Sequence, residues 1–167
     1  DDVRDAIARD LSGCAGGPVD VALNTDTAVA ALKGQCIDLL EVECADWEVD
    51  AGLLRAEAGE IVEESLHTHV LRSLCPVTAQ PDLGSLQVTY AGPRIDPAAL
   101  LRYIVSFREH NDFHEACVER IFVDISARCG PEKLSVFARY QRRGGIDINP
   151  FRSNEEANAT PLRLPRQ

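Results

Sequence analysis

The sequence predicts an α+β fold with an antiparallel sheet and two helices in each structural unit. The first observation is that apolar and polar residues alternate in several short segments, which is typical of half-buried strands. The second is that other segments carry apolar residues at helical spacing. The third is the order of these segments, since residues 61–150 are predicted as strand, strand, helix, helix, strand and strand.

The first part of the chain is predicted to contain one helix and two strands. Val3, Ile7 and Leu11 recur every four residues and would share one helix face, and the glycines before Pro18 would end that helix. The predicted elements are a helix over residues 1–12, a strand over 19–23, a poorer strand candidate over 35–43, and connections over 24–34 and 46–59.

The second part carries stronger signals. Asp96 suits a helix N-cap with Pro97 in the first helical position, and Gly130 followed by Pro131 would end a later helix. The first predicted elements are an extended segment over 60–74, for which a helix over 61–70 is not excluded, and a strand over 85–90 that Ala91-Gly92-Pro93 ends. Two helices follow, one over 96–108 and one from Asn111 or Asp112 to Cys129. The last elements are strands over 134–140 and 146–148, joined by a turn at 142–145, and a polar tail over 149–167.

The two parts resemble each other, which indicates an internal repeat. Asp10-Leu11-Ser12, followed by Cys14 and a Gly-Pro pair, echoes Asp124-Ile125-Ser126, followed by Cys129 and a Gly-Pro pair. The first copy lacks a front half, so we expect the natural protein to be longer. The expected division is residues 1–59 as the back half of a first module with a connection, 60–150 as a complete second module, and 151–167 as a tail.

Charge and cysteine usage limit the function classes. The formal net charge is −10, and residues 1–60 alone carry 14 acidic against 4 basic side chains. An acidic chain without a basic stripe argues against nucleic-acid binding through phosphates. There is no apolar run long enough for a membrane span and no signal peptide, so the irregularly spaced cysteines are predicted to be reduced thiols in the cytoplasm. They are Cys14, Cys36, Cys44, Cys75, Cys117 and Cys129.

The most informative stretch runs from Leu74 to Asp82. It places Cys75 and Asp82 at the two ends of a short turn that contains two prolines. A thiol becomes a nucleophile as the thiolate, and the product of its attack often needs a proton donor. The plainer interpretations are that Cys75 is a small buried apolar residue and that Asp82 is a turn residue.

Two further stretches carry chemistry. Residues 107–115 place His114 and Glu115 side by side where a helix is expected to begin. Glu115 follows Asp112 by three residues, so half of a capping box is the structural alternative. Residues 142–145, Arg-Arg-Gly-Gly, form a cationic turn that suits a small anionic ligand.

Three motifs in order resemble one family. They are Cys75-Pro76-Val77-Thr78-Ala79-Gln80-Pro81-Asp82, Ser106-Phe107-Arg108-Glu109-His110-Asn111-Asp112-Phe113-His114-Glu115-Ala116-Cys117-Val118, and Arg142-Arg143-Gly144-Gly145-Ile146-Asp147-Ile148-Asn149-Pro150-Phe151. The chain resembles the QueF-type 7-cyano-7-deazaguanine reductases, the nitrile reductases of queuosine biosynthesis, and most closely the C-terminal part of their long, two-module form. The resemblance covers nearly the whole chain and implies the tunnelling fold.

The resemblance also implies a mechanism and its residues. A Cys75 thiolate would add to the nitrile carbon and form a covalent thioimide, with Asp82 as the proton donor. NADPH would supply two hydrides in turn, giving the aminomethyl product. His114 and Glu115 would contact the 7-deazaguanine ring, and Arg143 and Gly144 the cofactor. No metal is implied, nucleic acid is not a direct partner, and a homo-oligomer is expected, a dimer for the two-module form.

One departure and two alternatives accompany this interpretation. The family's lysine-containing helix motif for substrate and NADPH is absent from residues 96–101, so this chain is expected to hold only part of the cofactor site. A zinc enzyme of the same fold could use His110, His114 and Cys117, although no CxxC or HExxH motif is present. A module kept only for assembly is the second alternative.

Overall fold

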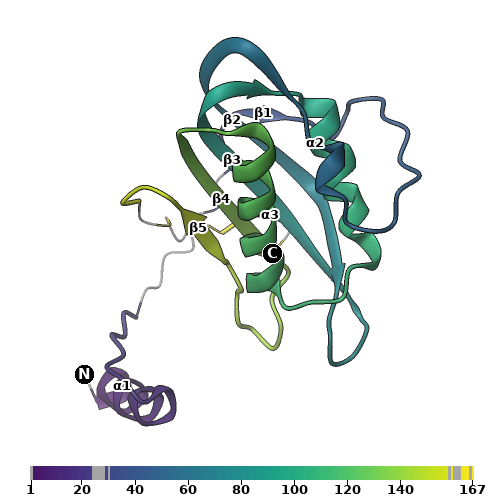
Figure 1. Ribbon diagram of the computed structural model, residues 1–167. Coiled ribbons are helices and arrows are strands. Elements are labelled where there is room, and N and C mark those ends of the chain that lie inside the picture. Colours follow the sequence, from purple (N-terminus) through teal and green to yellow (C-terminus); the bar gives the residue numbers. More distant parts are fainter. Residues whose placement is uncertain (1, 24–28, 30, 158, 160–162, 166) are drawn as a thin grey trace.

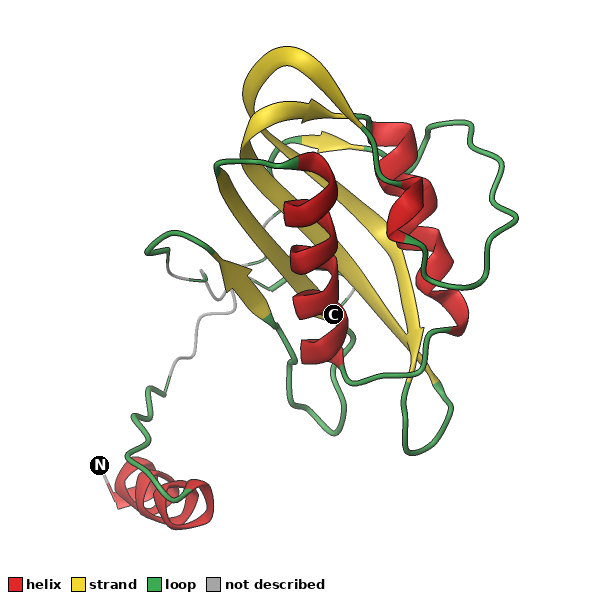
Figure 2. Ribbon diagram, in the orientation of Figure 1, coloured by secondary structure: helices red, strands yellow, loops and turns green. Residues whose placement is uncertain are grey.

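A computed structural model describes residues 2–23, 29, 31–157, 159, 163–165 and 167. A single five-stranded sheet carries helices α2 and α3 on one face, while α1 lies apart from the sheet (Figures 1 and 2). The elements are α1 (Asp2–Ala15), β1 (Gln35–Cys36), the 3-10 helix η1 (Ala51–Leu53), β2 (Ala56–Leu74), β3 (Pro81–Ile95), α2 (Pro97–Val105), the 3-10 helix η2 (Ser106–Glu109), α3 (His114–Cys129), β4 (Lys133–Tyr140) and β5 (Phe151–Ser153).

The sheet has the strand order β1-β2-β3-β4-β5. β1 runs parallel to β2, and every other pairing is antiparallel. The long β2–β3 hairpin shifts register between Thr68 and Leu71. This irregularity changes which side chains face the helices, because Leu66 and Thr68 are buried before it, and Leu71 and Ser73 after it.

The helices form for the reasons that the sequence indicates. The Asp96 carboxylate accepts hydrogen bonds from the amides of Ala98 (2.9 Å) and Ala99 (3.3 Å), and Pro97 begins α2, as predicted. Gly130 ends α3 in the left-handed conformation with φ 61°. The apolar faces of both helices pack on β2, β3 and β4 and make one core. No helix in the described part of the chain is both long and apolar enough to cross a membrane.

The amino-terminal part differs most from the prediction. The helix is confirmed and extends to Ala15, but residues 19–23 form no strand, and Leu23 is exposed. Alternation of apolar and polar residues does not form a strand unless a neighbouring strand supplies backbone hydrogen-bond partners. The candidate over residues 35–43 is a strand only at Gln35–Cys36. Residue 1 and most of the predicted connection over residues 24–34 lie outside the described residues.

The second part needs smaller corrections. β3 continues through Gly92 and Pro93 to Ile95, because a glycine there allows the backbone to approach Pro131, whose Cα would lie 2.6 Å from an added Cβ. α3 begins at His114, later than Asn111 or Asp112. These two differences come from packing between segments that are distant in sequence.

The carboxy-terminal strand also lies later than predicted. Residues 146–148 are not a strand, although Ile148 accepts a backbone hydrogen bond from Tyr140 at 3.1 Å, and the regular pairing begins at β5. Two parts of the predicted polar tail therefore join the fold, namely β5 and the buried Leu164. The order of strands and helices expected for residues 61–150 is otherwise confirmed.

Candidate active site

A tight turn between β2 and β3 presents Cys75. The Cys75 amide donates to the Gln80 carbonyl (2.9 Å), and the Ala79 amide donates to the Cys75 carbonyl (2.8 Å). Ala79 has φ 56°, a left-handed conformation that costs free energy for a residue with a Cβ and is held here by these bonds. The thiol is partly exposed at the end of the sheet. The turn therefore fixes the thiol without burying it.

Hydrogen bonds within this turn stabilise the thiolate. The pKa of Cys75 is lowered, first by the hydroxyl of Thr78 and then by the backbone amides of Thr78 and Val77. Burial and the negative charge of Asp82 act weakly in the opposite direction. A lowered pKa is the property that a nucleophilic cysteine needs. Thr78 is a site residue that the sequence interpretation missed.

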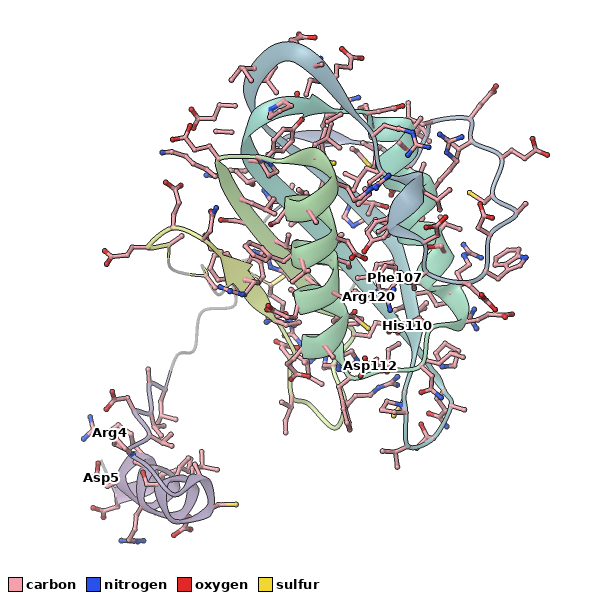
Figure 3. All side chains as sticks on the ribbon, in the orientation of Figure 1. Arg4, Asp5, Phe107, His110, Asp112 and Arg120 are labelled. Atoms are coloured by element: carbon pink, nitrogen blue, oxygen red, sulfur yellow. The ribbon has the colours of Figure 1, made fainter. Side chains whose placement is uncertain are left out.

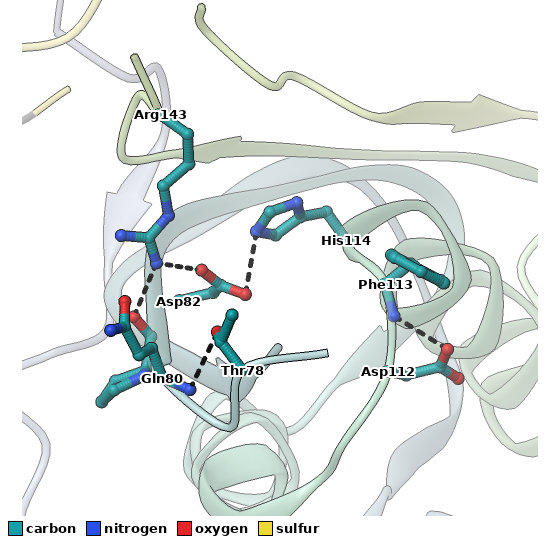
Figure 4. A network of polar contacts seen from close by, with 8 residues as sticks. Thr78, Gln80, Asp82, Asp112, Phe113, His114 and Arg143 are labelled. Atoms are coloured by element: carbon teal, nitrogen blue, oxygen red, sulfur yellow. Dashed lines mark hydrogen bonds and ion pairs between the residues drawn. The ribbon is translucent and has the colours of Figure 1, made fainter. Parts of the chain in front are cut away.

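Asp82 lies at the start of β3 and connects three parts of the site. Its side chain is only 5% exposed, and its Oδ2 lies 3.3 Å from Nε2 of His114. Its other oxygen accepts a hydrogen bond from Arg143, whose guanidinium also donates to the Pro81 carbonyl at 2.9 Å (Figure 4). Asp82 is thus a buried carboxylate in contact with an imidazole and a guanidinium, which is more than a turn residue needs.

His114 is the first residue of α3 and is held by the core. Its ring lies 4.1 Å from the ring of the fully buried Tyr140, at an interplanar angle of 50°. The His114 side chain is 12% exposed, so most of its ring is shielded from solvent, and its Nε2 edge faces Asp82. The structure therefore brings Cys75, Asp82 and His114 together from a turn, a strand and a helix. Tyr140 was not identified from the sequence.

Glu115 lies beside His114 but has a different environment. It is exposed and makes no hydrogen bond or ion pair with any residue that the structure describes. α3 has no side-chain cap, so the capping-box alternative is wrong, and the Phe113 amide is instead bound by the carboxylate of Asp112 at 2.8 Å. A carboxylate in the first turn is favoured by the helix dipole. It is available to a ligand.

The cationic turn lies after β4 and places Arg143 against Asp82. Arg143 and Ile146 bond to each other through both amides (3.0 Å each), and Gly144 and Gly145 have φ 57° and 86°. Arg143 lies on Asp82 and remains 46% exposed. Arg143 is therefore part of the site around Asp82. The next residue, Gly144, has no atom within 4 Å of the position that a Cβ would take.

The first turns of helix α2 offer no cationic side chain to a ligand over residues 96–101. Leu100 and Leu101 are buried in the core, and the carboxylate of Asp96 is used in the N-cap. This agrees with the absence of the lysine motif from residues 96–101.

The predicted zinc alternative does not have a suitable geometry. His110 packs its ring against Phe107 and lies 3.7 Å from Asp112 (Figure 3), and burial and the charge of Arg120 lower its pKa. Cys117 is fully buried, and burial raises the pKa of its thiol to about 11. In the described part of the chain, these residues are not gathered with His114 around one point. We therefore set this alternative aside.

The loop before α3 is joined to the Cys75 turn. The Leu74 amide donates to the His110 carbonyl (2.8 Å), and the Asp112 amide donates to the Leu74 carbonyl (3.2 Å). With its amide nitrogen turned toward the same backbone, Asn111 donates to the Cys75 carbonyl at 3.2 Å. Asn111 was also missed by sequence reasoning. These bonds hold the Cys75 turn against the segment that carries His114 and Glu115.

Comparisons with known proteins show what the chain is similar to. Residues 81–159 match the family described as QueF-like protein. The chain is 56% identical over 158 residues to the NADPH-dependent 7-cyano-7-deazaguanine reductase of Azoarcus sp. (strain BH72), covering 92% of this chain and 56% of that protein. The chain thus spans about half the length of the curated relative that it matches.

The fold is also found in a solved structure. The crystal structure of the archaeosine synthase QueF-Like in the apo form has a TM-score of 0.50 to this chain at 15% identity, covering 58% of this chain and 95% of that one. This likeness shows the fold alone. The chain therefore contains an α+β tunnelling-fold module with a cysteine and an aspartate at one end of its sheet. More particularly, residues 81–159 match the QueF-like family, in agreement with the resemblance recognised from the motifs.

Proposed function

We propose that this chain carries the nucleophile and proton donor of an NADPH-dependent reductase that converts 7-cyano-7-deazaguanine to 7-aminomethyl-7-deazaguanine. The observation that carries the proposal is the Cys75 turn, in which Thr78 lowers the pKa of a partly exposed thiol close to Asp82. The similarity to the Azoarcus reductase supports the choice of substrate and cofactor.

The first step uses the thiolate of Cys75. Its sulfur attacks the nitrile carbon, one C–N π bond breaks, and the nitrogen takes a proton from Asp82, which leaves a covalent thioimide on Cys75. Reduction of that carbon by hydride, with a second proton to nitrogen, gives a tetrahedral adduct. Its collapse would release the Cys75 thiolate and a protonated imine, and a second hydride would complete the amine. His114 lies where it can pass protons to Asp82.

Substrate recognition is proposed for His114 and Glu115. The carboxylate of Glu115 is exposed and has no partner among the described residues, so it can accept hydrogen bonds from the ring N–H and the amino group of a guanine-like edge. His114 has a ring fixed by Tyr140 and faces the same end of the sheet. The two residues would orient the nitrile toward Cys75.

NADPH, when bound, supplies the hydrides. The residues present fit one part of such a cofactor: Arg143 offers a guanidinium to a phosphate, and Gly144 offers backbone without a side chain. Arg143 is also bonded to Asp82, so its contact with a phosphate would change the environment of the proton donor.

The adduct itself provides the test. We expect the protein mixed with 7-cyano-7-deazaguanine, without NADPH, to gain the mass of one ligand. Cys75→Ala should show no gain, whereas the control Cys14→Ser, which removes an exposed thiol on α1, should behave like the parent. An adduct that survives Cys75→Ala, or one that peptide mapping places on another cysteine, would contradict the proposal.

Other parts of the proposal concern the whole protein. We propose a homo-oligomer, a dimer for a two-module chain, with no direct nucleic-acid partner. The division into residues 1–59, 60–150 and 151–167, with an incomplete first module, is retained as a proposal, and light scattering on the complete protein would measure its assembly. A cytoplasmic location fits the six cysteines, all of which are free thiols.

A further inference from the structure

We propose that Cys36, His67 and His69 form a binding site for a transition-metal ion, with Zn²⁺ the best match. One ligand atom from each residue lies within 4.8 Å of the other two. The site belongs to β1 and β2, and none of its residues takes part in the proposed reduction. Side chains alternate along a strand, and Leu66 and Thr68 face the core, so both histidines lie on the sheet face opposite α2 and α3.

Backbone pairing brings the three residues together. Cys36 is the direct neighbour of His67 in the parallel β1–β2 pair, and the Ile37 amide donates to the His67 carbonyl at 3.0 Å. His67 and His69 are two residues apart on one strand, with ring centroids 5.5 Å apart. The ligands are therefore set by strand register and not by a flexible loop.

A neighbouring carboxylate fixes this register. Asp38 accepts a hydrogen bond from the hydroxyl of Thr68 and one from the amide of His69, the latter at 3.0 Å. Because β1 contains only two residues, this contact keeps the segment after Cys36 in place beside β2. The distance between the thiol and the imidazoles is thus determined by the fold.

The imidazole rings have the outer contacts typical of metal ligands. Nδ1 of His67 lies 3.1 Å from the Lys33 carbonyl, and Nδ1 of His69 lies 2.7 Å from the hydroxyl of Ser85. A carbonyl can only accept, so Nδ1 of His67 donates, which puts the lone pair of that ring on Nε2. In metal sites, ligating histidines almost always donate their second nitrogen to such a group.

The ligand set selects the class of ion. A thiolate with two imidazoles suits Zn²⁺ and related ions, and disfavours Mg²⁺ and Ca²⁺, which prefer oxygen. Cys36 is exposed, so an ion can enter and a water molecule can complete a tetrahedral set. Binding would release the thiol proton and fasten β1 to the sheet. The role is therefore structural, at a place distinct from Cys75.

Titration with Zn²⁺ and Co²⁺ in a thiol-free reductant tests the site. We expect one ion per chain, a higher melting temperature with Zn²⁺, and a thiolate-to-metal charge-transfer band with Co²⁺. Cys36→Ser should abolish that band, and His67→Gln or His69→Gln should weaken Zn²⁺ binding at least tenfold. Ser85→Ala should weaken it about ten- to a hundredfold, as loss of an outer contact does.

Matched controls separate this site from general thiol or imidazole binding. Cys14→Ser and His110→Gln should bind Zn²⁺ like the parent protein, and Cys36→Ser should still form the nitrile adduct at Cys75. A parent protein that binds no Zn²⁺, or binding unchanged by Cys36→Ser and His67→Gln, would overturn the proposal. So would equal loss of binding in Cys14→Ser. None of these outcomes bears on the proposed reductase activity, which is read from the adduct.

Discussion

Cys75 and Cys117 are two thiols near the same end of the sheet, yet their surroundings have opposite effects. The turn around Cys75 directs a hydroxyl and two backbone amides at the sulfur and lowers its pKa. Cys117 lies on the buried face of α3, where removal from water raises the pKa to about 11. The pair shows that hydrogen-bond donors beside a partly exposed thiol favour its thiolate, whereas burial favours the neutral thiol.

The strongest test of this difference between Cys75 and Cys117 replaces each sulfur with oxygen. Cys75→Ser should reduce turnover to background, because a neutral hydroxyl is a far weaker nucleophile. Cys117→Ser should keep turnover but lower stability by about 1–3 kcal/mol, since a more polar group enters the core. The measurements are NADPH consumption and chemical unfolding of both variants. Comparable turnover losses would mean that Cys117 also takes part in the reaction.

Asp82 provides the next largest effect. Asp82→Asn keeps the shape of the side chain but removes its acidic proton, so the rate of nitrile reduction should fall about 10²–10⁴-fold. The adduct on Cys75 should form more slowly without vanishing, because Asp82 supplies the nitrogen proton in that step whereas substrate binding rests on other groups. Stopped-flow absorbance for the adduct and steady-state turnover separate the two steps. Reduction at the parent rate would remove the proton-donor role.

Substitution of Glu115 tests whether an exposed carboxylate beside the site binds the substrate. Glu115→Gln should weaken nitrile binding at least tenfold, about 1.4 kcal/mol, because the charge that strengthens two hydrogen bonds is lost. The melting temperature should hardly change, since Glu115 makes no hydrogen bond or ion pair with a described residue. A binding titration and a thermal melt on the same variant decide the matter. A lower melting temperature with unchanged affinity would assign Glu115 a structural role.

The smallest effect concerns how the Cys75 thiolate is stabilised. Thr78→Val removes the hydroxyl that contributes most to the lowered pKa, so the pKa of Cys75 should rise. At neutral pH less thiolate would be present, adduct formation would slow, and raising the pH would restore it. Thr78→Ser should behave like the parent. Rates of alkylation of Cys75 against pH measure the shift, and an unchanged midpoint would mean that the backbone amides suffice.

Local signals in the sequence predicted much of this structure. The Asp96-Pro97 start of α2, the Gly130 end of α3 and the Cys75–Asp82 turn are each determined by neighbouring residues, and all are present. The strand expected over residues 19–23 failed because strands need partners that alternation does not supply.

The candidate site was predicted less completely than the fold. Motifs pointed to the candidate site residues, but the contact of Arg143 with Asp82 and the packing of the His114 ring against Tyr140 join residues far apart in the sequence. Thr78 could have been noticed, because it stands three residues after Cys75 within one turn. The periodicity of apolar residues describes one helix or strand at a time, so it does not predict contacts between elements.

The two backbone bonds that join Leu74 to the His110–Asp112 loop have a consequence for folding kinetics. They connect the end of β2 to a segment that follows β3 and α2, so they close a long loop and cannot form early. The β2–β3 hairpin can pair locally first, with the thiol already in its turn. The thiol of Cys75 is thus placed early, whereas its neighbours on α3 arrive only when that longer loop closes.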